Sequence, residues 1–90
     1  MRQTNKWENV DHLDEHSINL IQLFNRETNE MLIVTEECDA ALEFIHLKTK
    51  PTFDEYGVLS YLEDCEEIKR KAYKADETYK AFLELIALVI

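Results

Sequence analysis

The feature that most constrains this chain is a long apolar repeat in its C-terminal third. Apolar or aromatic residues recur there at alternating spacings of three and four, and neither Gly nor Pro interrupts them. The repeat consists of Val58, Tyr61, Cys65, Ile68, Ala72, Ala75, Tyr79, Phe82, Ile86 and Val89. Such spacing over more than four heptads is typical of one long helix. The sequence therefore predicts a helix at about 53–88.

Residues just before this repeat resemble a helix start. Thr52 can cap the first turn, and Glu55 follows three positions later, as in a capping box. Pro51 disfavours helix in the residue before it and so separates this helix from the preceding element. The chain has one Gly and one Pro in 90 residues. This composition favours long helices with few connections, because turn-rich sheets need both residue types.

Two further elements are expected before residue 50. Acidic residues at Glu36 and Glu37 favour a helix at about 36–48, because a helix N-terminus stabilises negative charge. Its apolar face would hold Cys38, Ala41, Leu42 and Ile45. A β-hairpin is favoured at about 17–35, because Met31–Thr35 is rich in β-branched residues and Asn29 tolerates the left-handed backbone of a short loop. The alternative for this stretch is a helix, which would give an all-α hairpin of two long helices.

These elements together predict a single α+β domain over residues 1–90. It would contain a short N-terminal helix, the β-hairpin at about 17–35, the helix at about 36–48 and the long C-terminal helix at about 53–88. A domain of this length buries roughly two-thirds or less of its unfolded surface, so we expect a small stability margin.

Charge indicates the kind of partner. The net charge of −9 disfavours nucleic acid or an anionic membrane as the direct ligand, because both attract positive charge. Residues 27–67 contain twelve acidic and two basic residues, a net charge of −10. Such a surface attracts a basic protein, and it can imitate the phosphates of a nucleic acid. The expected partner-binding residues are Glu36, Glu37, Asp39, Glu43, Glu63, Asp64, Glu66 and Glu67.

The segment from Ser17 to Ile45 resembles the strand–turn–strand–helix core of small acidic phage anti-CRISPR proteins. The resemblance lies in the order of elements, in Asn29-Glu30 within the turn and in Glu36-Glu37 before the expected helix. It covers about a third of the chain. It implies a phage-type inhibitor that blocks a CRISPR nuclease by mimicking DNA, and therefore an acidic, non-enzymatic protein with no cofactor.

Two motifs raise the alternative of an enzyme. Met31–Ile45 resembles the first acidic helix of MazG-like all-α nucleoside triphosphate pyrophosphohydrolases, which would hold magnesium through carboxylates. Ala40 replaces a Glu of that family's motif, and Glu63 and Glu66 are the nearest substitute for its second pair. Separately, His12 and His16 lie in an H-x-x-E-H pattern that could hold zinc on a helix. Each set lacks ligands, so we expect neither a metal site nor catalysis.

The remaining expectations concern location and assembly. Cys38 and Cys65 lack metal-site spacing, and no apolar leader follows the first Met, so a reduced cytoplasmic location is expected. The last two turns of the predicted helix are apolar on nearly every side, which favours a homodimer or a helical oligomerisation module. The expected interface residues are Tyr79, Phe82, Ile86 and Val89.

Overall fold

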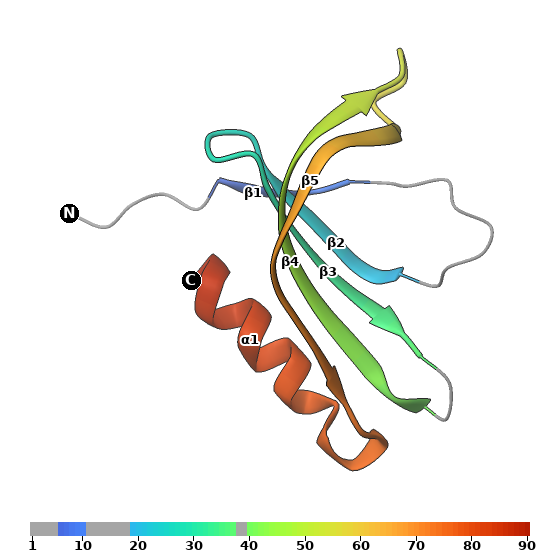
Figure 1. Ribbon diagram of the computed structural model, residues 1–90, viewed down its shortest axis with the longest axis vertical. Helices are drawn as coiled ribbons and strands as arrows, with labels where there is room; N and C mark the ends of the chain where they lie inside the picture. The colour runs from blue at the N-terminus through green and yellow to red at the C-terminus, as the bar shows by residue number, and fades with distance from the viewer. Residues whose placement is uncertain (1–5, 11–18, 38–39) are drawn as a thin grey trace.

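The computed structural model describes residues 6–10, 19–37 and 40–90 and shows one antiparallel sheet with a helix packed on it (Figure 1). The strands are β1 (Trp7–Asn9), β2 (Asn19–Asn25), β3 (Glu30–Glu36), β4 (Leu42–Phe53) and β5 (Leu59–Tyr73). A short 3-10 turn (Ala75–Glu77) leads into the helix α1 (Tyr79–Val89). The spatial order of the strands is β1-β2-β3-β4-β5, so each strand pairs with its neighbour in sequence.

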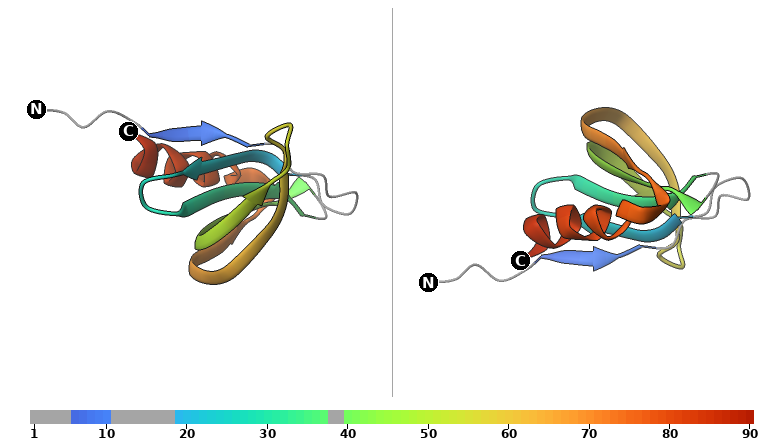
Figure 2. Two further views of the ribbon diagram at one scale, coloured as in Figure 1. Left: turned by 90° about the horizontal axis from the view of Figure 1, so that it is seen from above. Right: turned by 90° about the horizontal axis from the view of Figure 1, so that it is seen from below.

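The long β4–β5 hairpin extends beyond the rest of the sheet. β3 pairs with β4 only as far as Lys48, whereas the pairing of β4 with β5 continues to Phe53. The register between β4 and β5 shifts at three places, between His46 and Leu47, between Lys48 and Lys50, and between Thr52 and Phe53. Such irregularities bend and twist a strand pair. Along the long axis of the molecule, which is vertical in Figure 1, the tip of the hairpin lies at the top and α1 lies in the lower half. Figure 2 shows the curved hairpin from above and from below.

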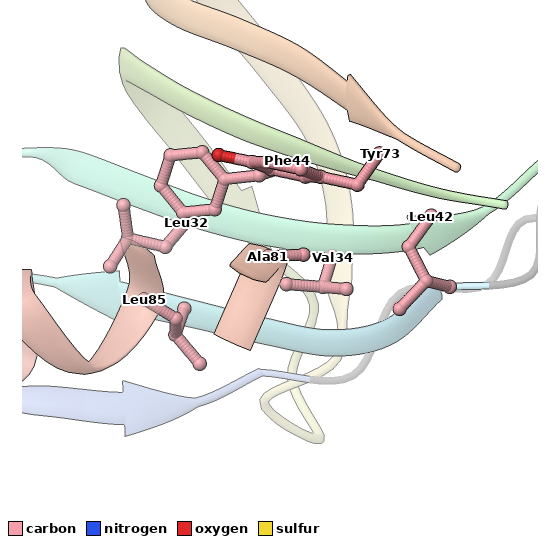
Figure 3. Close-up of a cluster of buried hydrophobic side chains, with 7 residues drawn as sticks. All are labelled: Leu32, Val34, Leu42, Phe44, Tyr73, Ala81 and Leu85. Carbon is pink, nitrogen blue, oxygen red and sulfur yellow. The ribbon is translucent and has the colours of Figure 1, made fainter. Parts of the chain in front are cut away.

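One face of the sheet forms a core with α1 (Figure 3). Leu32 and Val34 of β3 lie beside His46 and Phe44 of β4 in the register, so their side chains share this face. The cluster consists of Leu32, Val34, Leu42, Phe44, Tyr73, Ala81 and Leu85, all buried. Burying a side chain of the size of Leu or Phe stabilises the fold by about 1.5–3 kcal/mol. This cluster therefore holds α1 on the sheet.

The opposite face carries a second core. Met31 of β3 lies opposite Leu47 of β4, and Phe24 of β2 lies opposite Met31. This cluster contains Val10, Phe24, Met31, Ile45, Leu47 and Leu59, with Phe53 and Leu62 packed against it. Since Leu59 and Leu62 belong to β5, the bent hairpin contributes to covering this face. The central strands β3 and β4 are thus buried on both sides.

The predicted fold class is wrong in two places, and the first is the helix expected at about 36–48. Residues 42–53 form strand β4 instead. The helical interpretation used Leu42 and Ile45 and left out Phe44 and Leu47. All four are buried, on alternating faces. A strand buried on both faces reads as a continuous apolar run, which helical spacing can imitate over a short segment.

The second error is the long helix expected at about 53–88. The structure has β5 over Leu59–Tyr73, and helix begins only at Tyr79. Tyr61 and Ile68, which were assigned to the helical seam, are about half exposed on β5. The many Glu, Lys and Arg residues of this segment favour helix locally. Pairing along a buried neighbour outweighs that preference, because strand formation depends on tertiary contacts.

Other parts of the expected fold compare as follows. The described part of the hairpin expected at about 17–35 contains β2 and β3, and Asn29 has a φ of 60° in the turn between them. The expected short N-terminal helix is not found among the described residues before β2, where residues 7–9 form β1. Residues 11–18 lie outside the described part of the chain. The protein is therefore mainly β-sheet, neither helical in character nor an all-α hairpin.

Candidate binding surface

The acidic residues expected to bind a partner fall into two groups. Glu36 pairs with Leu42 at one end of β4, whereas Glu63 pairs with Lys50 eight residues further along it. An extended strand advances about 3.3 Å per residue, so up to about 26 Å separates the two positions. Asp39 lies outside the described residues. The eight predicted residues therefore do not form one continuous face.

The larger group lies toward the tip of the β4–β5 hairpin, in residues 50–67, which we name the acidic arm. The arm contains one basic residue, Lys50, and the acidic residues Asp54, Glu55, Glu63, Asp64, Glu66 and Glu67. Its net charge is −5. All six acidic side chains are exposed. The arm is therefore the most negative continuous element in the part of the chain that the structure describes.

Little of the charge on the acidic arm is neutralised within the chain. Nζ of Lys50 lies 3.6 Å from Oδ2 of Asp64, but both side chains are about 70% exposed. Solvent therefore leaves this ion pair weak. Glu67 accepts a hydrogen bond from Nε of Arg70 at 2.6 Å. Glu55 and Glu66 form no ion pair with any residue that the structure describes. These carboxylates remain available to an external cation.

A compact turn presents the tip of the acidic arm. The side chain of Asp54 accepts hydrogen bonds from the backbone N–H groups of Tyr56 and Val58, at 2.8 and 2.9 Å. Gly57 has a φ of 82°, a conformation that suits glycine. Tyr56 is 82% exposed at this tip. Sequence reasoning missed Tyr56, although Asp54 followed three residues later by Gly57 is a recognised turn signal.

Thr49 anchors the base of the acidic arm. Its side chain is buried, and its hydroxyl donates a hydrogen bond to the backbone carbonyl of Glu63 at 2.8 Å. Its backbone N–H donates to the carbonyl of Asn29, in the turn between β2 and β3, also at 2.8 Å. The hydroxyl lies 3.2 Å from Sγ of Cys65. These contacts join the arm to the body of the sheet and fix its direction.

Glu43 is the predicted residue least suited to binding a partner. Its side chain is only 15% exposed, and one of its oxygens accepts a hydrogen bond from Nη1 of Arg70 at 2.7 Å. Arg70 contacts Glu67 as well, and this hydrogen bond, more than the charge of Glu43, raises the pKa of the guanidinium. Arg70 thus links the two acidic groups and neutralises part of each.

The metal-binding interpretations find no site among the described residues. Glu36 lies on β3 and Glu63 on β5, so the carboxylates that resembled the pyrophosphohydrolase motif do not face each other from two helices. Within residues 6–10, 19–37 and 40–90, no group of three or more His, Cys, Asp or Glu is placed to hold a metal ion. His12 and His16 lie outside these ranges. Across the same ranges, no helix is both long and apolar enough to span a membrane.

The expected self-association residues divide between the two sides of α1. Tyr79 and Ile86 are exposed, at 58% and 44%, whereas Phe82 and Val89 pack against the core. The exposed side instead forms an apolar line at spacings of four, three and four, which we name the outer stripe. It consists of Tyr79, Leu83, Ile86 and Ile90. Half of the predicted interface therefore points inward.

Comparison with known proteins gives no match. No protein-family model matches the chain, and neither a curated protein nor a solved structure matches it with significance.

Proposed function

We propose that this protein is a small protein-binding inhibitor whose acidic arm occupies a basic, nucleic-acid-handling surface of its partner. The observation that carries the proposal is the arm itself, an anchored hairpin with a net charge of −5 and exposed carboxylates along its length. A fixed array of negative charge attracts a basic groove and increases the rate of encounter. The protein would act by occupying the groove and would need neither catalysis nor a cofactor.

The arrangement of the acidic arm supports a DNA-mimic mechanism. Glu63 and Glu66 lie opposite Lys50 and Lys48, which are two residues apart on β4, so both carboxylates belong to one face of β5. Glu67 lies opposite Leu47 and belongs to the other face. Such an array can replace the phosphates that a basic groove normally binds. The order of elements behind the resemblance to small acidic phage anti-CRISPR proteins is not found, because β4 replaces the expected helix. The proposal therefore rests on the acidic arm. The exposed thiol of Cys65 agrees with a reducing cytoplasmic location.

The site that we propose for partner binding is narrower than the set of residues expected from the sequence. We assign it to Glu63, Asp64 and Glu66 on β5, to Glu55 at the tip, and to Tyr56 as an exposed aromatic contact. Glu36 and Glu37 are exposed but lie at the other end of β4. Glu43 is held by Arg70. Aromatic residues often anchor protein interfaces, so Tyr56 would add apolar contact to the electrostatic attraction.

A neutralisation series tests this proposal. Glu63→Gln, Asp64→Asn, Glu66→Gln and Glu67→Gln together remove four charges from the acidic arm. The control variant carries Glu27→Gln, Glu36→Gln, Glu37→Gln and Asp76→Asn, which remove four charges elsewhere. The probe is a set of DNA-binding proteins eluted from a DNA column and passed over each immobilised variant. We expect retention by the wild type and the control, loss with the arm variant, and competition by duplex DNA.

The salt response gives a second criterion. Binding through the acidic arm should weaken steeply between about 50 mM and about 500 mM salt, because exposed charges are screened over a few ångströms at high ionic strength. Equal retention by the arm variant and the wild type, or binding that salt and DNA leave unchanged, would exclude the mimic mechanism.

A second candidate function, self-association through α1, is favoured by the exposed outer stripe.

A further inference from the structure

Strand β5 forms a long free edge of the sheet. It pairs with β4 on one side and has no neighbouring strand among the described residues on the other. Its residues 63–72 are all exposed. An edge strand presents a row of N–H and C=O groups that can pair with another strand. The edge is therefore able to accept a further strand along a length of ten residues or more.

Charges on this edge are separated by sign. The acidic residues Glu63, Asp64, Glu66 and Glu67 precede Ile68, and the basic residues Lys69, Arg70, Lys71 and Lys74 follow it. The segment 63–74 is thus neutral overall, although the chain carries −9. If a strand of this kind lies antiparallel to a copy of itself, the acidic half of each copy meets the basic half of the other. The segment is complementary to itself.

We propose that two copies of this chain associate by antiparallel pairing of their β5 edges about the step from Ile68 to Lys69. In this register Glu67 of one copy lies opposite Arg70 of the other, and Glu66 lies opposite Lys71. A two-fold axis perpendicular to the sheet repeats each pair, and a single sheet continues across both copies. Opposite charges placed directly across two strands stabilise their pairing.

The register within the chain supports this arrangement, because it places the paired charges on matching faces. Glu67 lies opposite Leu47, and Arg70 lies opposite Ile45, so both belong to the face that carries the second core. Glu66 lies opposite Lys48, and Lys71 lies opposite Phe44, so both belong to the face that carries α1. Ile68 has no partner on β4, so β5 contains one extra residue at this position. Because of this extra residue, Glu67 and Arg70 belong to the same face although they are three positions apart.

A simpler role for these charges is protection of the edge against unwanted pairing, which charged residues and bulges often provide. Protection requires charge on the edge but no particular order of sign. Mixed or uniform charge would repel a second copy at least at some positions. Here the order makes the charged positions attractive in one register, and the partly exposed Ile68 lies at its centre. The order of sign therefore indicates a second copy as the occupant.

This inference is independent of the proposed function, although both surfaces include Glu66. If both hold, self-pairing and partner binding compete for the same edge. The test below uses pure protein without any partner, so its failure would leave the proposed function unaffected. Salt is not the criterion, because both copies carry −9 and their overall repulsion opposes the local attraction.

A charge swap tests the pairing. Glu66→Lys and Lys71→Glu each place like charges opposite each other in the self-pair, and neither residue forms an ion pair with a described residue. Mixed in equal amounts, the two variants restore opposite charges at both positions of a mixed pair. Sedimentation equilibrium at up to about 1 mM should show a wild-type dimer. Each variant alone should weaken it at least tenfold, and the mixture should recover it.

Two controls make the result specific. Glu55→Lys at the tip and Lys6→Glu beside β1 repeat the same charge changes away from the β5 edge, and both should dimerise as the wild type does. Amide exchange of residues 64–72 should slow as wild-type concentration rises. A wild type that stays monomeric at about 1 mM, a mixture that does not recover, or a dimer lost only in Leu83→Asp/Ile86→Asp would each overturn the proposal. The last result would assign the interface to the outer stripe.

Discussion

The ammonium group of Lys69 donates hydrogen bonds to both carboxylate oxygens of Glu84, at 2.7 Å each. Lys69 lies on the edge strand β5 and Glu84 on α1, fifteen residues later. The pair therefore joins the edge strand β5 to the helix that packs on one face of the sheet. It is the ion pair through which charge, as well as apolar contact, holds α1 in place.

The first prediction concerns this pair at high pH. The hydrogen bond to Glu84 raises the pKa of Lys69 above its ordinary value of 10.5. The pair's contribution to stability is thus fully present below about pH 10.5 and is lost as the pH rises through the higher pKa of the folded state. Urea midpoints of the wild type and Lys69→Met should differ at neutral pH and converge above about pH 10.5.

Lys48→Met is the matched control for that comparison, because Lys48 is exposed and forms no ion pair with a described residue. Its difference from the wild type should stay nearly constant over the same range of pH. A difference between Lys69→Met and the wild type that does not change with pH would show that the ion pair contributes nothing.

The second prediction concerns the docking of α1. Leu85 is buried in the core between the helix and the sheet, so Leu85→Ala removes apolar contact and leaves a cavity. We expect a loss of about 2–5 kcal/mol in the free energy of unfolding. Leu88, on the same helix, is 43% exposed, and Leu88→Ala should cost less than about 1 kcal/mol. Similar losses for the two variants would contradict the assigned face of the helix.

The third prediction concerns the anchor of the acidic arm. Thr49→Val keeps the shape of the side chain and removes the hydroxyl that donates to the carbonyl of Glu63. The loss of one hydrogen bond should cost about 0.5–1.5 kcal/mol. Amide exchange in residues 62–66 should rise more than elsewhere, because the arm loses a fixed contact. Exposed Thr52→Val serves as the control, and equal exchange in both variants would show that Thr49 does not anchor the arm.

The fourth prediction separates the two sides of α1. Phe82 packs against the core, so Phe82→Asp places a charge in apolar surroundings and should destabilise the fold by about 2 kcal/mol or more. Ile86 is 44% exposed, and Ile86→Asp should leave the thermal midpoint nearly unchanged. Thermal unfolding followed by circular dichroism decides the matter. An Ile86→Asp variant that unfolds as readily as Phe82→Asp would show that the outer stripe is covered.

Part of the fold was predictable because its signals are local. Asn29, a residue type that tolerates the left-handed conformation, indicated a turn, and the β-branched run Met31–Thr35 indicated a strand. The structure has both, with Asn29 left-handed between β2 and β3. Strand β4, at 42–53, was wrongly predicted as part of a helix, although its sequence contains a signal for a strand. Leu42 and Phe44 together with Ile45 and Leu47 supply apolar residues to both faces, which a two-sided buried strand needs and a surface helix does not.

Strand β5 was not predictable by the same means. Seven of its fifteen residues are charged, most are exposed, and its two buried members are Leu59 and Tyr73, at its ends. No alternation of apolar and polar residues reveals such a strand, because its stability comes from backbone pairing with β4. The chance alignment of Tyr61, Cys65 and Ile68 with the apolar side of α1 then imitated one continuous helix.

The candidate site was predictable in composition but not in place. The excess of acidic residues in 27–67 was visible in the sequence, yet their division between the two ends of β4 depends on the register of three strands. The role of Arg70 in holding Glu43 was likewise hidden, because these residues are 27 positions apart. Tyr56 could have been found from Asp54 and Gly57 if the stretch had been treated as a turn.

The strand order β1-β2-β3-β4-β5 has a consequence for how the protein folds. Every strand pair joins segments that are consecutive in the chain, so no crossover connection has to close before pairing begins. Topologies of this kind have low contact order for a β protein and fold comparatively fast, because little loop entropy is lost before contacts form. Folding can begin at the short β2–β3 turn and extend outward by one strand at a time, with α1 closing over Leu32 and Phe44 once β4 and β5 have formed their shared ladder.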